Sequence, residues 1–459
     1  MFHPLLVAIL SLGLLSAPAV ASDAADPLGV RGLQASPPAP SVTGLPATRL
    51  TLAEAVGLAL ANNPRTAASW AAVEAQGAAV GQARAAYLPT VSVQAGLARD
   101  DVGSSSPVGS GVSNSASVSV AATYLLYDFG QREASERAAL EQLAAANASL
   151  DGTVQALLLD TAQAYFALLG TDASLAATVT TETSAKASLD AATARYQAGA
   201  GTPADRLQAQ TAHSQAVLNR IRAEGERRNA RGSLATLLGL PPVTALALAD
   251  EPPTLLNPHA AEAVETLIAR AMDARPELRA ADAQVRAAQA QATAVRAAGM
   301  PTVSVGVNLG VSTTPRFDDY ATPNSVGLTV SVPLFTGYRT SYQIQQADAL
   351  IRQRAAERAS LAQSVALSVW KAYQDVVTQN QALAAARDLV ASGTQSEQVA
   401  LGRYRAGVGS ILDVLSAQSA VASARQQEVL ARYQLAMAKV TLVQSLGALD
   451  LHSFATAAR

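Results

Sequence analysis

The sequence predicts a mainly α-helical chain with a smaller β part, in which one structural pattern occurs twice in tandem. Apolar residues make up 49% of the 459 residues, and many of them are alanine, a strong helix former. Four short segments instead alternate apolar and small polar residues, which is the period of a β-strand. The sequence Arg-Tyr-x-Ala-Gly-x-Gly occurs at residues 195–201 and again at 403–409. These three observations predict long helices, four strands and a duplication.

Both Arg-Tyr segments are predicted to be the tips of helical hairpins. In each, a glycine stands where a helix commonly ends in the left-handed conformation. A Thr or Ser then provides the N-cap of the next helix, with Asp three positions later, which is a capping box with Asp in place of Glu or Gln. The residues of this motif are Tyr196, Gly199, Thr202 and Asp205 in the first copy, and Arg403, Tyr404, Gly407, Ser410 and Asp413 in the second.

The composition excludes several classes of protein. The formal net charge is −2, so no broad basic surface for nucleic acid is expected. The chain has no cysteine, which excludes disulfides, thiolate metal sites and a cysteine-linked lipid anchor. The four histidines are scattered, and no nucleotide-binding or hydrolase motif occurs. We therefore expect no enzymatic activity, no metal and no cofactor.

The N-terminal region is predicted to be a targeting segment followed by a leader. Residues 1–21 have an apolar core at Leu5–Leu15 and a small-x-small cleavage site at Ala19-Val20-Ala21, as in a secretory signal peptide. The alternative is a membrane anchor, but the apolar run is short for a spanning helix. Residues 22–48 are rich in Pro, Ser and Ala, which predicts an irregular leader.

The two copies repeat one order of elements. The first copy, residues 49–240, is predicted to contain a helix interrupted near Asn63-Pro64, strands at about 90–98 and 115–126, a long helix at 130–196, the tip at 196–205 and a return helix at 203–238. A Pro-rich linker follows at 241–260. The second copy, residues 261–447, is predicted to have strands at about 302–312 and 325–334 and its tip at 404–413, before a tail at 448–459. In this alignment Phe335-Thr336-Gly337 corresponds to Asp128-Phe129-Gly130.

Four strands per chain predict a shared barrel. Valine and leucine line one face of each strand, and Ser, Thr, Asn or Gly line the other. Closed outer-membrane barrels need at least eight strands of about 9–11 residues, so one chain cannot close a barrel alone. Three chains would pool twelve strands, with the apolar face toward outer-membrane lipid. The alternative, a soluble sandwich, fits poorly with helices of about 100 Å.

At this point the chain resembles the TolC family of outer-membrane efflux proteins. The resemblance covers about residues 50–447 and is carried by Asn63-Pro64, Leu88-Pro89-Thr90, Tyr127-Asp128-Phe129-Gly130, Leu334-Phe335-Thr336-Gly337 and both Arg-Tyr tips. It implies a TolC-like homotrimer whose four barrel strands per chain meet in one barrel, with long helical hairpins in the periplasm. It also implies a periplasmic adaptor and an inner-membrane pump or ABC exporter as partners.

The resemblance implies a passive export duct, for which two uses stay open beside one reading without a pore. One is the exit duct of a tripartite efflux pump, and another is type I secretion of a protein such as a toxin or protease. The lack of a cysteine-linked anchor leans slightly away from lipid-anchored multidrug channels. A third reading, without a pore, is a periplasmic coiled-coil scaffold or adaptor.

The resemblance also implies where the channel is gated. It puts Asp205, Tyr404 and Asp413 on positions that hold the periplasmic tips closed, and makes the exposed turns at the tip glycines an adaptor contact. Some family members carry Arg where this chain has Gly409, so that pairing does not transfer. Arg403, Arg405 and Arg206 are the candidates to replace it. The alternative role of both aspartates is helix capping alone.

Overall fold

The computed structural model describes residues 26–35, 49–102, 111–249, 262–314 and 319–450. The predicted signal peptide and much of the predicted leader lie outside these residues. The helices are η1 Arg31–Leu33, α2 Leu52–Asn62, α3 Pro64–Ala85, α4 Gln131–Gln197, α5 Pro203–Leu237, α6 Val264–Ala274, α7 Pro276–Ala297, α8 Arg339–Arg405 and α9 Ile411–Ser445. Within the described residues, no helix is both long enough and apolar enough to cross a membrane.

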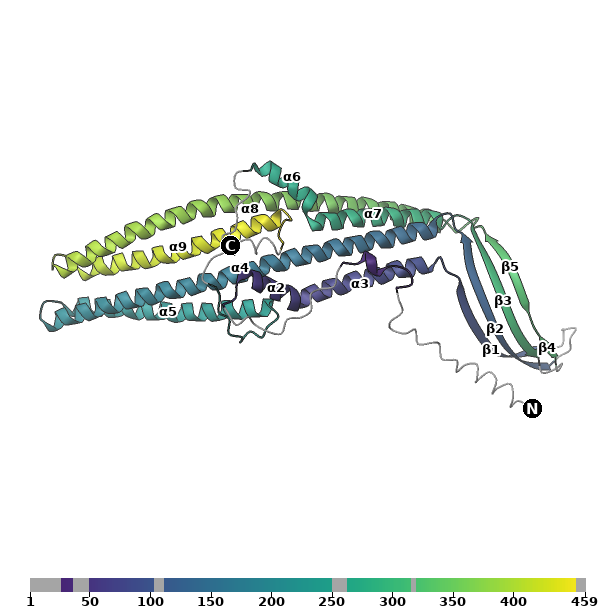
Figure 1. Cartoon of the computed structure of the whole chain (residues 1–459), viewed down its shortest axis with the longest axis horizontal. Helices are drawn as coiled ribbons and strands as arrows, with labels where there is room; N and C mark the ends of the chain where they lie inside the picture. Colours follow the sequence, from purple (N-terminus) through teal and green to yellow (C-terminus); the bar gives the residue numbers. More distant parts are fainter. Residues whose placement is uncertain (1–25, 36–48, 103–110, 250–261, 315–318, 451–459) are drawn as a thin grey trace. The chain divides into compact units, whose positions relative to one another are not determined.

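The strands form one antiparallel sheet. They are β1 Thr90–Val102, β2 Gly111–Tyr127, β3 Thr302–Thr314, β4 Asp319–Ala321 and β5 Asn324–Ser331. Their order is β1, β2, β3, with both β4 and β5 paired to β3 (Figure 1). The β2–β3 ladder therefore joins the first copy of the duplicated pattern to the second.

The strand ends differ from the sequence prediction in three places. The segments of β1 and β2 next to their connecting loop pair with each other over Arg99–Val102 and Gly111–Asn114, although their pattern is polar, because main-chain pairing is indifferent to side-chain type. A short strand, β4, lies in the predicted second loop. β5 ends at Ser331 rather than near residue 334, because Pro333 has no N–H to give to the ladder.

The chain divides into two compact units. One contains residues 1–35, 72–146 and 283–355, and therefore the sheet and the helix segments next to it. The other contains residues 36–71, 147–282 and 356–459, and therefore both helical hairpins. Helices α4 and α8 are each 67 residues long without interruption.

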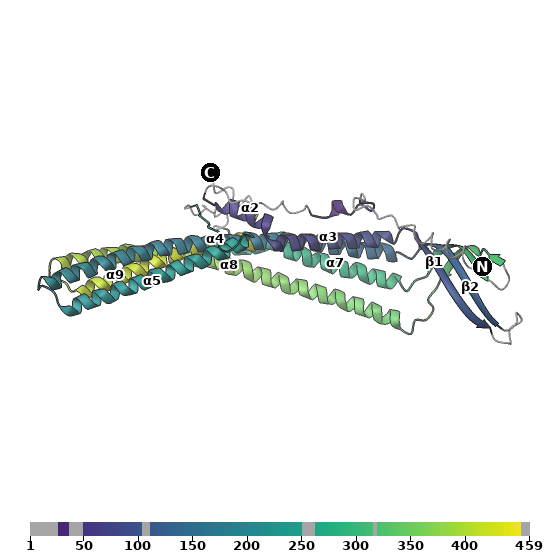
Figure 2. The ribbon, with the colours of Figure 1, turned by 90° about the horizontal axis from the view of Figure 1, so that it is seen from below.

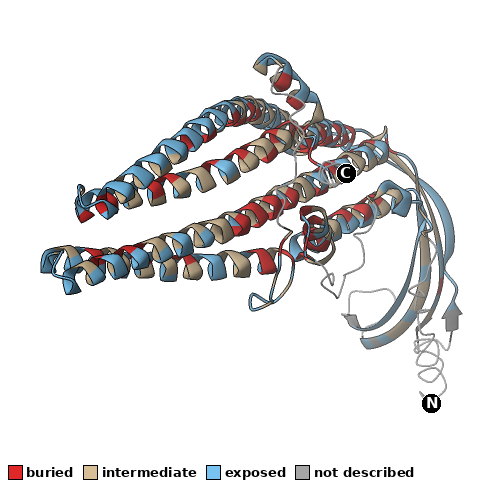
Figure 3. Ribbon diagram, turned by 60° about the vertical axis from the view of Figure 1, so that its left-hand side comes forward, coloured by how far each residue is buried: buried red, intermediate tan, exposed pale blue. Residues whose placement is uncertain are grey.

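The sheet exposes the apolar side chains of its strands. Val91 and Val93 are each 67% exposed on β1, and Val326 is 75% exposed on β5. The strands are accordingly drawn as exposed or intermediate in Figure 3, whereas buried residues gather on the helices. A single chain thus leaves an apolar surface uncovered where a soluble sheet would form its core.

The unit that contains both hairpins has a hydrophobic core at the ends of α5 and α9 that are farthest from the tips. Tyr165 and Phe166 of α4 are almost fully buried there, and the Tyr165 hydroxyl donates to the Leu50 carbonyl at 3.0 Å. Leu50 also pairs in parallel with Leu248 of the predicted linker. The described part of that linker is thereby bound to the start of the first copy.

Each return helix ends against the proline break of its own copy. Gly239 follows α5 with φ +72°, and a Cβ there would lie 2.7 Å from Asn62 Cβ. Gly447 follows α9 with the same φ, and a Cβ would lie 3.0 Å from Arg275 Cα. The Asn63 side chain donates to the Leu237 carbonyl at 3.0 Å. In each copy, the glycine that follows the return helix therefore packs against the residues just before the helix-breaking proline, Pro64 or Pro276.

The strand-to-helix junctions correct the alignment of the two copies. Left-handed backbone occurs at Phe129 and Gly130 before α4, and at Gly337 and Tyr338 before α8. Asp128 therefore corresponds to Thr336, not to Phe335 as the sequence alignment predicted. Sequence comparison misplaces the short indel because it cannot see which residues carry the turn.

Candidate functional site: the two helical tips

Each tip joins two antiparallel helices through a tight turn. The hairpins are α4–α5 and α8–α9, and Figure 2 shows them running alongside one another. Gly199 and Gly407 take φ of +72° and +79°, values that L-residues with a Cβ rarely adopt. In both copies the glycine amide donates to the carbonyl of the tip tyrosine at 3.1 Å, which satisfies an orphan carbonyl of the ending helix.

Both return helices begin with a reciprocal capping box. The Thr202 hydroxyl accepts from the Asp205 amide at 3.1 Å, and the Asp205 carboxylate accepts from the Thr202 amide at 3.2 Å. Ser410 and Asp413 repeat this arrangement with the same two distances. The two aspartates thus stabilise their own helix N-termini, where the helix dipole also favours a negative charge.

The second glycine of each turn packs against the helix that has just ended. A Cβ on Gly409 would lie 3.0 Å from the Tyr404 nitrogen and 3.1 Å from the Arg403 carbonyl carbon. Gly201 has the equivalent contacts at 3.1 and 3.3 Å. An arginine at position 409 would press its Cβ against main chain, so this tight turn explains the departure from the family pattern.

The two tip tyrosines have different surroundings. Tyr404 is 7% exposed and packs with Ile411 and Val414. Tyr196 is 39% exposed, and the Arg206 guanidinium lies 5.2 Å from its ring centroid. The same sequence motif therefore gives a buried ring in the second tip and a half-exposed ring in the first.

Arg195 connects the first hairpin to the second. Its guanidinium donates to the Tyr404 carbonyl at 2.8 Å and lies 4.7 Å from the centroid of the Tyr404 ring. A second polar contact joins Ser188 to Gln418 at 3.2 Å. Sequence reasoning missed Arg195. It belongs to the repeated motif, but no pattern reveals that its side chain reaches the other hairpin.

The structure does not bring the other predicted residues together. Asp205 and Asp413 bond within their own turns. Arg206 contacts Tyr196 of its own hairpin. Arg403 and Arg405 are exposed, and within the described residues neither makes an ion pair or side-chain hydrogen bond.

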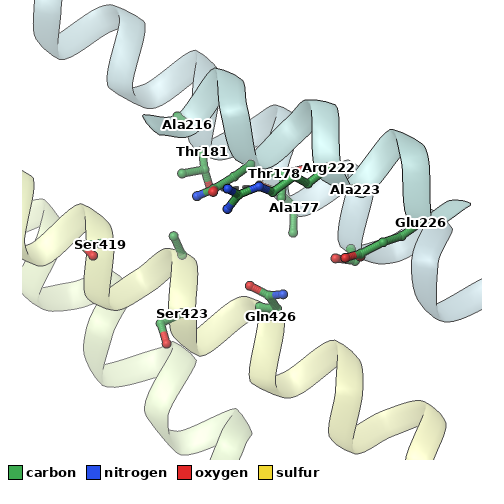
Figure 4. Close-up of a pocket in the computed structure, with 13 residues that line it drawn as sticks. Ala177, Thr178, Thr181, Ala216, Arg222, Ala223, Glu226, Ser419, Ser423 and Gln426 are labelled. Atoms are coloured by element: carbon green, nitrogen blue, oxygen red, sulfur yellow. Dashed lines mark hydrogen bonds between the residues drawn. The ribbon is translucent and has the colours of Figure 1, made fainter. Parts of the chain in front are cut away.

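A cleft lies between the two hairpins, at some distance along the helices from the tips. It has a volume of about 330 Å³ and lies between α4, α5 and α9 (Figure 4). Small side chains line much of it, among them Ala177, Ala216, Ser419 and Ser423. Arg222 and Glu226 of α5 add charge, with Arg222 beside Thr178 and Thr181 and Glu226 further along the cleft (Figure 4). The two hairpins are therefore not packed tightly along this stretch.

A sheet with an exposed apolar face, together with paired long helical hairpins, is the arrangement expected of an outer-membrane export channel. The chain belongs to the outer membrane efflux protein family, which matches residues 55–240 and 267–448. Protein CyaE of Bordetella pertussis is 32% identical over 409 residues, covering 87% of this chain and 84% of the relative. Outer membrane protein TolC of Escherichia coli is 25% identical over 356 residues, covering 74% and 70%.

Solved structures share the fold. A membrane protein from Pseudomonas aeruginosa superposes with a TM-score of 0.78 at 28% identity, covering 86% of this chain and 93% of that one. The outer-membrane channel OprN gives the same TM-score at 21% identity, covering 87% and 90%. The predicted family and fold class are therefore confirmed.

Membership of this family identifies the function. The chain is an outer-membrane efflux channel of a Gram-negative bacterium, of the kind that serves tripartite pumps or type I secretion. It is a channel and not an enzyme. Channels of the family are trimeric and work with efflux pumps. The reading as a scaffold without a pore is set aside.

Proposed function

We propose that three copies of this chain form one twelve-stranded barrel, the exit duct through which an inner-membrane pump exports its substrate. The observation that carries this is the open sheet. β4 and β5 pair one after the other with the same edge of β3, so they occupy one strand position and each chain supplies four. Within the part of the chain that the structure describes, β1 and β5 each present an unpaired edge, and such edges must be covered. Pairing β5 of one chain with β1 of the next closes the sheet and places the exposed valines and leucines against lipid.

The helical hairpins project into the periplasm in this arrangement, and their tips form the gate. The gate residues we propose are Tyr196, Gly199, Thr202, Asp205, Arg403, Tyr404, Gly407, Ser410 and Asp413. The exposed turns at Gly199 and Gly407 would contact a periplasmic adaptor, which links the duct to a proton-driven pump or an ABC exporter. Conduction is passive, because the channel itself has no chemistry to perform.

Two measurements test this proposal. Outer-membrane fractions should yield a trimer by native mass spectrometry, and the purified trimer should conduct in a planar bilayer, rarely and in small steps while the tips are closed. Substituting Val326 and Leu328, both strongly exposed on β5, by Asp should abolish insertion. A soluble periplasmic monomer would contradict the proposal.

A gene deletion in the native bacterium separates the two uses of the duct. The deletion should sensitise the cell to small toxic compounds if the channel serves an efflux pump. Loss of a secreted protein from the medium, with unchanged drug sensitivity, would instead assign it to type I secretion.

A further inference from the structure

Arg195 of the first tip contacts both the carbonyl and the ring of Tyr404 of the second, and we call this two-part contact a clasp. The charge-assisted hydrogen bond from Arg195 ends on the Tyr404 carbonyl, in the last turn of α8. Carbonyls at that position carry the negative end of the helix dipole, which favours a cation. The same guanidinium lies over the Tyr404 ring at 4.7 Å, within the range of a cation–π interaction. The contact thus has two attractive components in one geometry.

The duplication leaves one arginine and one tyrosine of the motif without a contact to the other hairpin in the described part of the chain. Arg403 is the second-copy equivalent of Arg195, and it is exposed. Within the described residues it makes no ion pair or side-chain hydrogen bond. Tyr196 is the equivalent of Tyr404, and its ring is 39% exposed. Its carbonyl accepts the Gly199 amide as the Tyr404 carbonyl accepts the Gly407 amide, and a carbonyl oxygen has two lone pairs.

A ring of two-copy chains repeats the contact between copies. Around a trimer, each first hairpin is followed by a second hairpin of the same chain, and each second hairpin by a first hairpin of the next chain. Resting on the trimeric gate proposed above, we infer that Arg403 clasps Tyr196 of the partner subunit just as Arg195 clasps Tyr404. The closed mouth then has three clasps within chains and three between chains, and these replace the pairing that Gly409 removes.

The two kinds of clasp differ in strength. Tyr404 packs with Val414, which is fully buried. The corresponding position in the first tip is Arg206, whose guanidinium is already 5.2 Å from the Tyr196 ring. A second cation approaching that ring is repelled by the first. The clasps between chains are therefore the weaker ones, and the mouth opens first at the chain boundaries.

Cysteine pairs test the geometry, because the natural chain has no cysteine. Arg403→Cys with Tyr196→Cys, treated with a short bismaleimide in the native trimer, should give covalent dimers and trimers on a denaturing gel. Arg195→Cys with Tyr404→Cys should be cross-linked within one chain, and the protein should therefore still run as a monomer on the denaturing gel. Arg405→Cys with Tyr196→Cys is the matched control and should give little cross-linked product. Absence of cross-linked oligomers from the first pair, in a trimer that conducts, would overturn the inference.

Conductance tests the energetics. Arg195→Ala and Arg403→Ala should each raise the open probability of the bilayer channel, roughly fivefold for Arg403→Ala if one exposed cation–π contact is lost, and more for Arg195→Ala, whose contact is the stronger one. Arg206→Val, which copies Val414 into the first tip, should lower it. An Arg206→Val channel that opens more often than the wild type would contradict the ranking of the clasps.

The tyrosine variants separate this clasp from a hydroxyl-based gate. Tyr404→Phe keeps the ring and the carbonyl and should raise the open probability much less than Tyr404→Leu, which keeps apolar volume but removes the π face. If Tyr404→Phe opened the channel equally, the clasp would be wrong while the gate stood. A wild-type protein that formed no trimer would instead refute the proposed function.

Discussion

The two strand-to-helix junctions share one backbone conformation, but different side chains hold them: a charged pair at the first and two hydroxyls at the second. At the first, Arg132 pairs with Asp128 at 3.0 Å, donates to the Leu125 carbonyl at 2.8 Å and lies 5.0 Å from the centroid of the Tyr87 ring. At the second, two hydroxyls, of Thr336 and Thr340, lie 3.0 Å apart. The comparison shows that the turn itself is set by left-handed residues, and that the side chains decide how firmly it is held.

The charged junction is also the more vulnerable one. The Arg132 and Asp128 side chains are only 12% and 7% exposed, so the loss of one leaves the other with little water to take the partner's place. The threonine pair carries no such dependence. Of the two duplicated junctions, the first is therefore held by the stronger interaction, and its stability requires both Asp128 and Arg132.

Removing Asp128 should have the largest effect. Asp128→Ala leaves a buried guanidinium without its carboxylate, and we expect a loss of about 3–5 kcal/mol in the free energy of unfolding. Thr336→Ala should cost only about 1 kcal/mol. Chemical denaturation in detergent, followed by circular dichroism, measures both. The double variant Asp128→Thr with Arg132→Thr copies the second junction and should lose less than Asp128→Ala. Equal losses for the two single variants would remove the difference between the junctions.

The contact at the end of each return helix should be sensitive in both copies. Gly239→Ala and Gly447→Ala each place a Cβ against neighbouring atoms at positive φ, and we expect a loss of about 1–3 kcal/mol. Gly239 should suffer more, since its nearest contact is shorter. The matched control is Gly225→Ala within α5, where a Cβ meets nothing within 4 Å, and helix propensity should give a gain of about 0.5–1 kcal/mol. Thermal melts of the three variants would show the order.

The capping boxes should be equivalent. Thr202→Ala and Ser410→Ala each remove one N-cap hydrogen bond, and we expect each to cost about 1 kcal/mol. Hydrogen exchange at the first turns of α5 and α9 reads the two tips separately. A much greater effect in one tip would show that its cap also supports the gate.

Tyr87 should make the first junction weakly sensitive to alkali. Burial raises the pKa of the Tyr87 hydroxyl, Glu136 raises it further, and Arg132 opposes them. A raised pKa in the folded state means that stability is complete below the unfolded pKa of about 10 and falls as pH rises through the folded pKa. Tyr87→Phe should flatten that fall. Melting temperatures measured from pH 8 to pH 11 would test it, with Tyr338→Phe as the control at the second junction. An unchanged slope would exclude Tyr87 as the cause.

Features that depend on a few adjacent residues were predicted from the sequence, whereas contacts between residues far apart in the chain were not. The capping boxes at Thr202 and Ser410 and the positive φ of Gly199 and Gly407 depend on a few adjacent residues, so their pattern is legible. The burial of Tyr404 depends on how α8 and α9 pack against each other, and the contact of Arg195 with Tyr404 depends on how the two hairpins meet. Even the alignment of Asp128 with Thr336 required the backbone.

The ladder between β2 and β3 has a consequence for biogenesis. Helices α4, α5, α6 and α7 all lie between these two strands in the sequence, so the central ladder has to wait until most of the chain has been made. Helical hairpins form from neighbouring residues and fold early, whereas pairing over such a separation is slow. For that interval β2 can pair with β1 of its own copy, but its other edge and the apolar face of the hairpin stay open to water, in a state prone to aggregation.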